Sequence, residues 1–91
     1  NHMRVIILYR PNSEHSRQVE DYIADFQRFH PGAKLESHNI DSIDGSHVAE
    51  TYQIMQYPAI LALADDGQVQ QQWQGANNLP LMNDLAYFAN Q

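Results

Sequence analysis

Two serine hydroxyls and an imidazole lie within four consecutive residues near the start of the chain, Ser13-Glu14-His15-Ser16. A nucleophilic serine needs a base within hydrogen-bonding reach and a third group that orients this base. Neighbouring positions in the first turn of a helix do not face each other, and no acid is placed to orient His15. We therefore assign no catalytic residue and expect His15 to face solvent. Hydroxyl side chains at this point also suit the capping of a helix N-terminus.

The chain contains no cysteine and five histidines. Without thiols it can form no disulfide, exchange none and offer no thiolate to a metal. The histidines lack the i, i+4 or H-x-H spacing that is typical of zinc sites. These patterns predict neither a metal site nor a cofactor.

Charge and length narrow the class of protein further. The formal charge is −6, with 11 acidic residues against 5 basic ones, and the basic residues are scattered singly. Nucleic-acid binders carry a basic stripe that neutralises phosphates, so we expect no nucleic-acid partner. The apolar run Arg4–Tyr9 is far too short to span a membrane, and no membrane partner is expected. Ninety-one residues with a hydrophobic fraction of 43% suit one folded domain.

The first two residues, Asn1-His2, resemble an expression scar ahead of Met3, which leaves residues 3–91 as a single domain. If Met3 is the true start, we expect a cytoplasmic protein. A domain cut from a longer chain would have the same sequence pattern.

The elements that position the Ser-x-x-Ser turn follow from the pattern on either side. Arg4–Tyr9 is typical of a strand buried on both faces, and Pro11 ends it. Asn12 or Ser13 is the predicted cap of the next helix, which Pro31-Gly32 ends. Apolar residues at helical spacing form its expected buried stripe: Val19, Tyr22, Ile23, Phe26 and Phe29.

A second strand and a short helix are predicted next. Ala33–Asp41 is the expected strand, with core positions at Leu35 and Ile40. Asp44 or Ser46 is the predicted cap of the helix, which Tyr57-Pro58 ends. Its apolar positions are Val48, Ala49, Tyr52 and Met55.

A hairpin and a last helix complete the pattern. Ala59–Ala64 and Gln68–Gln74 are the predicted strands, joined by a tight turn at Asp65-Asp66-Gly67. Alternation predicts that Val69, Gln71 and Trp73 share one face. The break at Gly75–Asn78 places Asn78 as the cap of a helix that buries Leu81, Met82, Leu85 and Phe88.

The order is therefore β-α-β-α-β-β-α, an α/β domain with a central four-stranded mixed sheet. A helical crossover makes the first two strands parallel, and the hairpin makes the last two antiparallel. A sheet this apolar needs helices on both faces.

This order, with the residues at its joints, resembles the thioredoxin-like superfamily in its minimal four-stranded form, over Arg4–Asn90. Ser13-Glu14-His15-Ser16 stands in the place of the Cys-x-x-Cys motif. The segment from Asp41 to Tyr57-Pro58-Ala59 is similar to the family segment that ends in a cis-proline. Asp66-Gly67 and Gly75-Ala76 are similar to the hairpin glycine and to the glycine before the last helix.

The resemblance implies a groove formed by the helix N-terminus, the cis-proline and the last loop. In the family, the backbone of the residue before this proline pairs with a bound peptide or with glutathione. We therefore expect a redox-inactive module that binds a peptide, a protein partner or a small ligand. Its expected site residues are Pro11, Asn12, Ser13, His15, Ser16, Tyr57, Pro58, Gly75 and Asn77.

Three alternatives stay open. The first is a glutathione-binding or transferase-like protein, with Ser13 on the sulfur and Asn77-Asn78 at the γ-glutamyl end. Glutathione transferases also have a second helical domain, which this chain lacks. The second is a purely structural or assembly domain, in which an edge strand or an outer helix face makes a homodimer, so that the protein is a monomer or a weak homodimer. The third is a thiol oxidoreductase whose cysteines were changed to serine.

Overall fold

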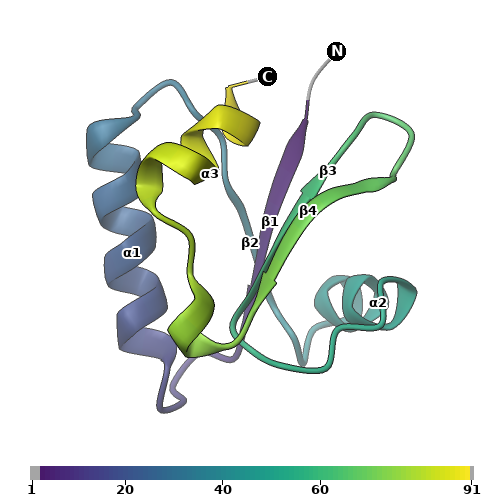
Figure 1. The fold of residues 1–91 in the computed structure, drawn as a ribbon. Helices are drawn as coiled ribbons and strands as arrows, with labels where there is room; N and C mark the ends of the chain where they lie inside the picture. Colours follow the sequence, from purple (N-terminus) through teal and green to yellow (C-terminus); the bar gives the residue numbers. More distant parts are fainter. Residues whose placement is uncertain (1–2, 91) are drawn as a thin grey trace.

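The computed structural model describes residues 3–90; the expected scar Asn1-His2 lies outside the described residues, as does Gln91. The predicted element order is confirmed (Figure 1). The elements are β1 (Arg4–Tyr9), α1 (Ser16–Phe29), β2 (Glu36–Asn39), α2 (Ile43–Thr51), β3 (Ala59–Leu63), β4 (Val69–Gln74), the 3₁₀ turn η1 (Ala76–Asn78) and α3 (Met82–Ala89).

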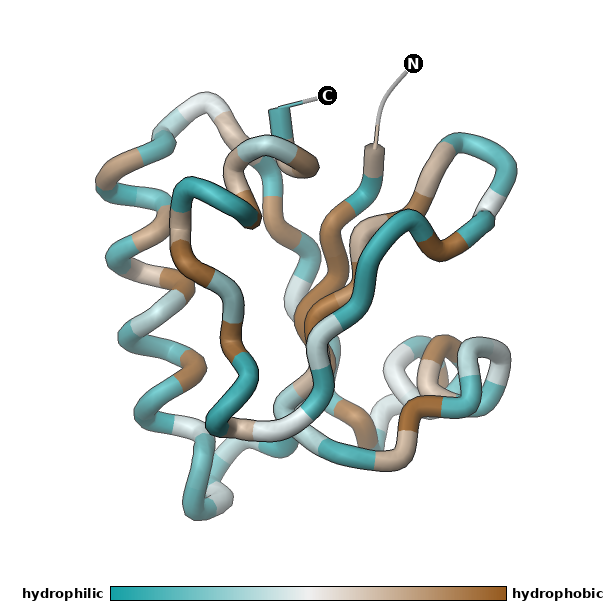
Figure 2. The backbone as a smooth tube through the Cα atoms, in the orientation of Figure 1, coloured by the Kyte–Doolittle hydropathy of each residue, from teal (hydrophilic) through white to brown (hydrophobic). Residues whose placement is uncertain are grey.

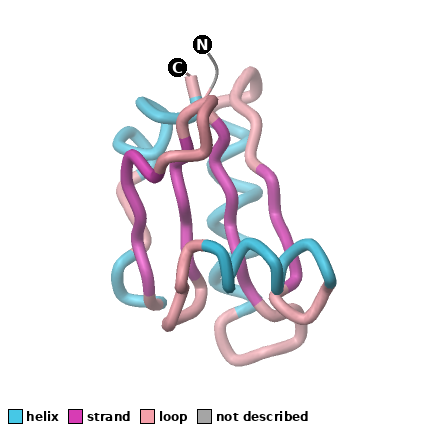
Figure 3. The backbone as a smooth tube through the Cα atoms, turned by 90° about the vertical axis from the view of Figure 1, so that its right-hand side faces the viewer, coloured by secondary structure: helices cyan, strands magenta, loops and turns pink. Residues whose placement is uncertain are grey.

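One four-stranded mixed sheet organises the domain, with the strand order β2-β1-β3-β4 (Figure 3). Strand β1 runs parallel to β2, and the hairpin β3–β4 is antiparallel, as predicted. The structure adds that β1 pairs antiparallel with β3. Strand β3 and residues 5–8 of β1 are fully buried, because both strands lie inside the sheet and their residues are apolar on both faces.

Helices cover both faces of the sheet, as predicted. On one face α1 and α3 pack against alternate residues of the central strands, including Val5, Ile7 and Ile60. On the other face residues of α2 and of the loop after it pack against the remaining ones, including Ile6 and Leu61. Figure 2 shows the apolar central strands between these two layers. The core therefore has two halves that share β1 and β3.

The predicted cap of α1 is wrong. The N-cap position is His15, two residues or more after the predicted Asn12 or Ser13. Asn12 has a φ of 64°, in the left-handed region that asparagine tolerates, and the chain makes a further turn before the helix begins. Phe29, expected in the buried stripe, is 64% exposed because it lies at the last position of α1.

The predicted cap of α2 is also wrong. Ser42 occupies the N-cap, and its hydroxyl oxygen accepts from the Gly45 N–H at 2.9 Å, so the helix begins before Asp44 and Ser46. The helix ends at Thr51, which leaves Met55 outside it and 82% exposed.

Strand β2 is shorter than predicted. Its four residues leave Leu35 and Ile40 just beyond its two ends. Both are partly buried, and they pack against opposite halves of the core.

A β-bulge changes the predicted faces of β4. Leu63 pairs with Val69 and Ala62 pairs with Gln71, so one residue of β4 is skipped in the register. Paired residues lie on the same side of a sheet, which places Val69 on the α2 side and Trp73 on the α1/α3 side. The prediction that Val69, Gln71 and Trp73 share one face is therefore wrong for Val69.

The start of α3 differs as well. Asn78 ends the turn η1, and the N-cap of α3 is Leu81, which is 75% exposed instead of buried. Leu85 is buried, and Met82 and Phe88 are partly buried, as the stripe predicts. Within residues 3–90, every helix is too short or too polar to cross a bilayer.

Candidate functional site

The segments that the sequence analysis selected lie together at one end of the strands, where β1 and β4 end and β3 begins (Figure 1). Two hydrogen bonds join them. The Gly75 N–H donates to the Pro58 carbonyl at 2.9 Å, and the Gln18 side-chain amide donates to the Ala76 carbonyl at 3.0 Å. The Tyr57–Pro58 peptide bond is cis. We call the surface at this end of the strands the rim; it is formed by residues 10–16, 41–43, 55–58 and 74–77.

Both serines of the turn use their hydroxyl groups within the turn itself. Ser13 Oγ donates to the Arg10 carbonyl, and Ser16 Oγ donates to the Ser13 carbonyl at 2.9 Å. The Ser16 N–H donates to the same Ser13 oxygen at 3.2 Å. These hydroxyls therefore shape the turn before α1, and neither proton points at a base.

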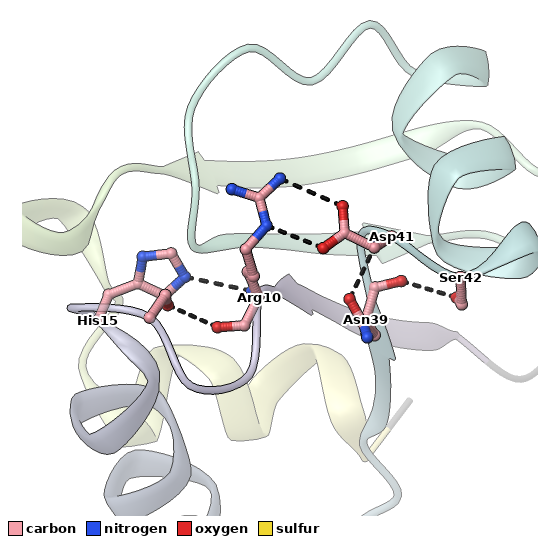
Figure 4. Close-up of polar contacts among 6 residues, drawn as sticks. Arg10, His15, Asn39, Asp41 and Ser42 are labelled. Atoms are coloured by element: carbon pink, nitrogen blue, oxygen red, sulfur yellow. Dashed lines mark hydrogen bonds and ion pairs between the residues drawn. The ribbon is translucent and has the colours of Figure 1, made fainter.

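His15 was expected to face solvent, but it is only partly exposed. Its imidazole is half-buried and folds back over the turn, where Nε2 accepts from the Arg10 N–H at 3.3 Å (Figure 4). This contact requires an unprotonated Nε2, because a protonated imidazole nitrogen has no lone pair to accept with. The position of His15 explains why the pair Ser13–His15 forms no nucleophile–base couple.

An ion pair that the sequence analysis did not identify closes the rim between β1 and β2. Arg10 Nε lies 2.9 Å from Asp41 Oδ2, and its second nitrogen lies 3.2 Å from Oδ1, a bidentate arrangement (Figure 4). The hydrogen bond to Arg10 lowers the pKa of Asp41, and the same bond raises the pKa of the guanidinium. The Asp41 N–H also donates to Asn39 Oδ1 at 2.9 Å, which holds the carboxylate in place.

A signal for this pair was present in the sequence. Arg10 directly follows β1, and Asp41 follows β2 after one residue. Parallel strands end at the same edge of a sheet, so opposite charges just past their ends are neighbours.

The rim also contains exposed apolar side chains that the sequence analysis missed as site residues. Met55 is 82% exposed and Ile43 is 87% exposed. The backbone N–H groups of Met55 and Gln56 both donate to Gln74 Oε1, at 3.1 and 3.2 Å, which holds this loop against the end of β4. Ile43 lies in the segment that was predicted as a turn, and Met55 was predicted to lie on the apolar face of a helix that in fact ends at Thr51.

Two surface hollows lie away from the rim. One, of about 640 Å³, is lined by residues that include Arg4, Lys34 and Glu36, at the opposite end of β1. The other lies between the end of α1 and the start of α3, beside Phe29 and Leu81. Among residues 3–90, no group of three or more His, Asp or Glu side chains is placed to hold a metal ion.

No protein-family model and no curated protein matches the chain. Solved structures do match it along nearly its whole length. Mitochondrial thioredoxin 3 from Saccharomyces cerevisiae is 16% identical with a TM-score of 0.69, over 99% of this chain and 78% of that one. Fasciola hepatica thioredoxin is 13% identical with a TM-score of 0.69, over 98% of this chain and 79% of that one.

An uncharacterised thioredoxin-like protein from Clostridium perfringens is 13% identical with a TM-score of 0.72, over 98% of this chain and 69% of that one. At such identities the likeness concerns the fold alone. The chain has a thioredoxin-like fold, βαβαββα, as the resemblance implied. It contains no cysteine, so it carries no Cys-x-x-Cys motif and is inactive in thiol–disulfide exchange.

Proposed function

We propose that this cysteine-free thioredoxin-fold protein is a binding module that holds an extended peptide segment of a partner protein along the rim. The observation that supports this most directly is the exposure of Met55 and Ile43 in a rim where hydrogen bonds join residues 55–58 to residues 74–75. A preorganised backbone with exposed apolar side chains lowers the cost of ordering a binding site. Nothing in this proposal requires a thiol.

The chemistry of the rim suits an extended main chain better than a small reactive ligand. An extended peptide is held by main-chain hydrogen bonds, which the backbone around Tyr57 would supply, and by pockets for alternate side chains. Met55 offers a flexible, polarisable side chain that adapts to different apolar partners. The Arg10–Asp41 pair places one cation and one anion at the same edge, where polar peptide groups can orient.

The test is to select peptides of about 12 residues from a random display library and to map the tightest one by amide chemical shifts. Shift changes concentrated in residues 12–16, 55–58 and 74–77 support the proposal. We expect Met55→Ala and Ile43→Ala to weaken binding about tenfold, or roughly 1.4 kcal/mol. Leu81→Ala is the matched control, because Leu81 is also exposed and lies away from the rim. Shift changes confined to other surfaces overturn the proposal.

Titration with glutathione separates the proposal from the alternative that uses Ser13. A serine that stabilises a glutathione sulfur must donate its proton to that sulfur, whereas Ser13 donates to the Arg10 carbonyl. We expect no shift change at Ser13 or Tyr57 with glutathione at a few millimolar, where even weak sites with a Kd of about 1 mM are filled. Saturable changes at both residues would favour the glutathione-binding alternative instead.

A further inference from the structure

We propose that the free edge of β4 pairs antiparallel with β4 of a second copy of this chain, so that two sheets join into one of eight strands. Strand β4 is the last strand in the order β2-β1-β3-β4 and forms the left-hand edge of the sheet in Figure 3. Such an edge presents a row of backbone donors and acceptors that can template a further strand. This inference is independent of the rim and of what binds there.

The composition of β4 leaves this edge without the usual protection. Its sequence is Val-Gln-Gln-Gln-Trp-Gln, with neither charge nor proline, and Figure 2 shows it as a polar band beside the apolar central strands. Edges that avoid pairing carry charges or prolines. The opposite edge has such protection, because β2 carries Glu36 in an ion pair with Arg4 at 2.9 Å. The two edges therefore differ in their capacity to accept another strand.

The backbone direction of β4 identifies which groups are offered. The Gly75 N–H points to the Pro58 carbonyl, on the β3 side. Because amide direction alternates along a strand, the Gln72 N–H points away from β3. This N–H donates to Gln71 Oε1 at 3.0 Å, and the Gln74 side-chain amide donates to Gln72 Oε1 at 3.0 Å. The Gln71 side chain thus occupies the position where a carbonyl group of a fifth strand would bind.

A second copy fits this edge because its chemistry is self-complementary. A two-fold interface brings each surface against itself, and a glutamine amide, which both donates and accepts, can pair with another glutamine. The distribution of charge also favours antiparallel pairing of the two β4 strands. Antiparallel pairing places the acidic turn at Asp66 of the two copies at opposite ends of a six-residue strand, about 20 Å apart, which exceeds the Debye length of roughly 8 Å at physiological salt. The rest of the chain, with a net charge of −6, repels a second copy in other orientations.

The expected association is weak. Pairing of one strand edge buries less than the roughly 1,200 Å² that is typical of stable interfaces, and the glutamine contacts must first open. Sedimentation velocity of the purified chain from about 10 μM to about 1 mM should therefore show a dimer fraction that rises with concentration. Gln72→Pro removes an N–H that does not serve β3, so we expect it to weaken dimerisation at least tenfold.

Two lysine variants keep the test decisive if Gln72→Pro fails to fold, which circular dichroism would show. Gln72→Lys places like charges in the paired edge and should give a monomer, whereas Gln27→Lys adds the same charge on the exposed surface of α1 and should dimerise like the parent chain. In the parent chain, the Gln72 amide should exchange more slowly at high concentration. A monomeric parent chain at about 1 mM, or equal weakening by the two lysine variants, overturns the proposal.

Discussion

Gly45 in the first turn of α2 lies directly against the backbone carbonyl of Asn39 at the end of β2. A Cβ atom built on residue 45 would overlap the Asn39 carbonyl oxygen, far closer than van der Waals contact allows, and would lie 2.7 Å from the carbonyl carbon. Ser42 contributes to the same contact, since its hydroxyl donates to the Asn39 carbonyl at 2.7 Å and accepts from the Gly45 N–H. This close approach sets the distance between α2 and the sheet.

Gly45→Ala should therefore destabilise the fold by about 1–3 kcal/mol, the range for overpacking a close contact. Chemical denaturation measures this loss as a lower midpoint. Gly32→Ala is the matched control, because a Cβ on Gly32 meets nothing within 4 Å. That variant should be neutral or gain a few tenths of a kcal/mol. Equal midpoints for the two variants would contradict the contact.

Ser42→Ala should cost about 1 kcal/mol, because it removes the side-chain acceptor for the Gly45 N–H at the start of α2. Ser46→Ala removes only a hydroxyl that donates to the Ile43 carbonyl within the helix, so we expect a change below about 0.5 kcal/mol. Urea denaturation of both variants compares the two serines directly. A larger effect at Ser46 than at Ser42 would place the helix start where the sequence analysis expected it.

Tyr22→Phe should destabilise the fold by about 1–2 kcal/mol, because the phenol donates to the Pro80 carbonyl at 2.8 Å and its loss leaves that buried acceptor unpaired. Burial, with a smaller contribution from the charge of Asp84, raises the pKa of Tyr22 to about 12. The neutral phenol is thus favoured in the folded state. The contribution of the Tyr22 hydroxyl to the stability of the fold is complete below the ordinary tyrosine pKa of about 10. It is lost as the pH rises toward 12.

Ultraviolet titration of tyrosinate should show a group that ionises near pH 12, and Tyr22→Phe should remove it. Tyr9→Phe is the control for stability, since its hydroxyl donates to Glu20 at an exposed position and should matter less. A spectrum in which all tyrosines ionise together near pH 10 would argue against a buried Tyr22 hydroxyl.

Acid should weaken the pairing of β1 with β2 through Glu36. The hydrogen bond from Arg4 lowers the pKa of Glu36, so the folded state favours the carboxylate. The resulting stability is present above the ordinary glutamate pKa and is lost as the pH falls through the lowered value. Because both side chains are partly exposed, we expect only about 0.2–1 kcal/mol. Glu36→Gln should remove this part of the pH dependence, which denaturation at pH 7 and pH 3 would measure.

The strands and the order of elements along the chain could be predicted because β1 and β3 are apolar at every position or nearly so, and because proline and glycine mark their ends. Helix starts could not. In α1 the chain inserts a turn with Asn12 at positive φ, and in α2 the cap depends on how closely Gly45 approaches β2. Both are consequences of tertiary packing, which local capping preferences do not contain. The bulge in β4 likewise leaves alternation intact in the sequence while it reverses the face of Val69.

The rim was predictable as a set of segments but not as a set of contacts. The resemblance to the thioredoxin-like superfamily implied that its turn, its proline and its last loop lie together, and the structure places all three at the same end of the sheet. The hydrogen-bond partners of Ser13 and His15 are backbone groups of Arg10. A motif made of residue types does not predict contacts with backbone groups. Met55 was assigned to a helix face, because apolar spacing alone does not show that α2 has already ended.

The two guanidinium–carboxylate pairs of β1 have a consequence for strand alignment. In a strand with one polar face, a slip by one residue exposes apolar side chains and is thereby disfavoured. Residues 5–8 of β1 are apolar on both faces, so hydrophobicity alone distinguishes poorly between neighbouring alignments. Arg4 pairs with Glu36 at one end of β1, and Arg10 pairs with Asp41 just past the other. A shift along β2 would break both pairs at once, so these surface charges specify which residues of the two strands lie opposite each other.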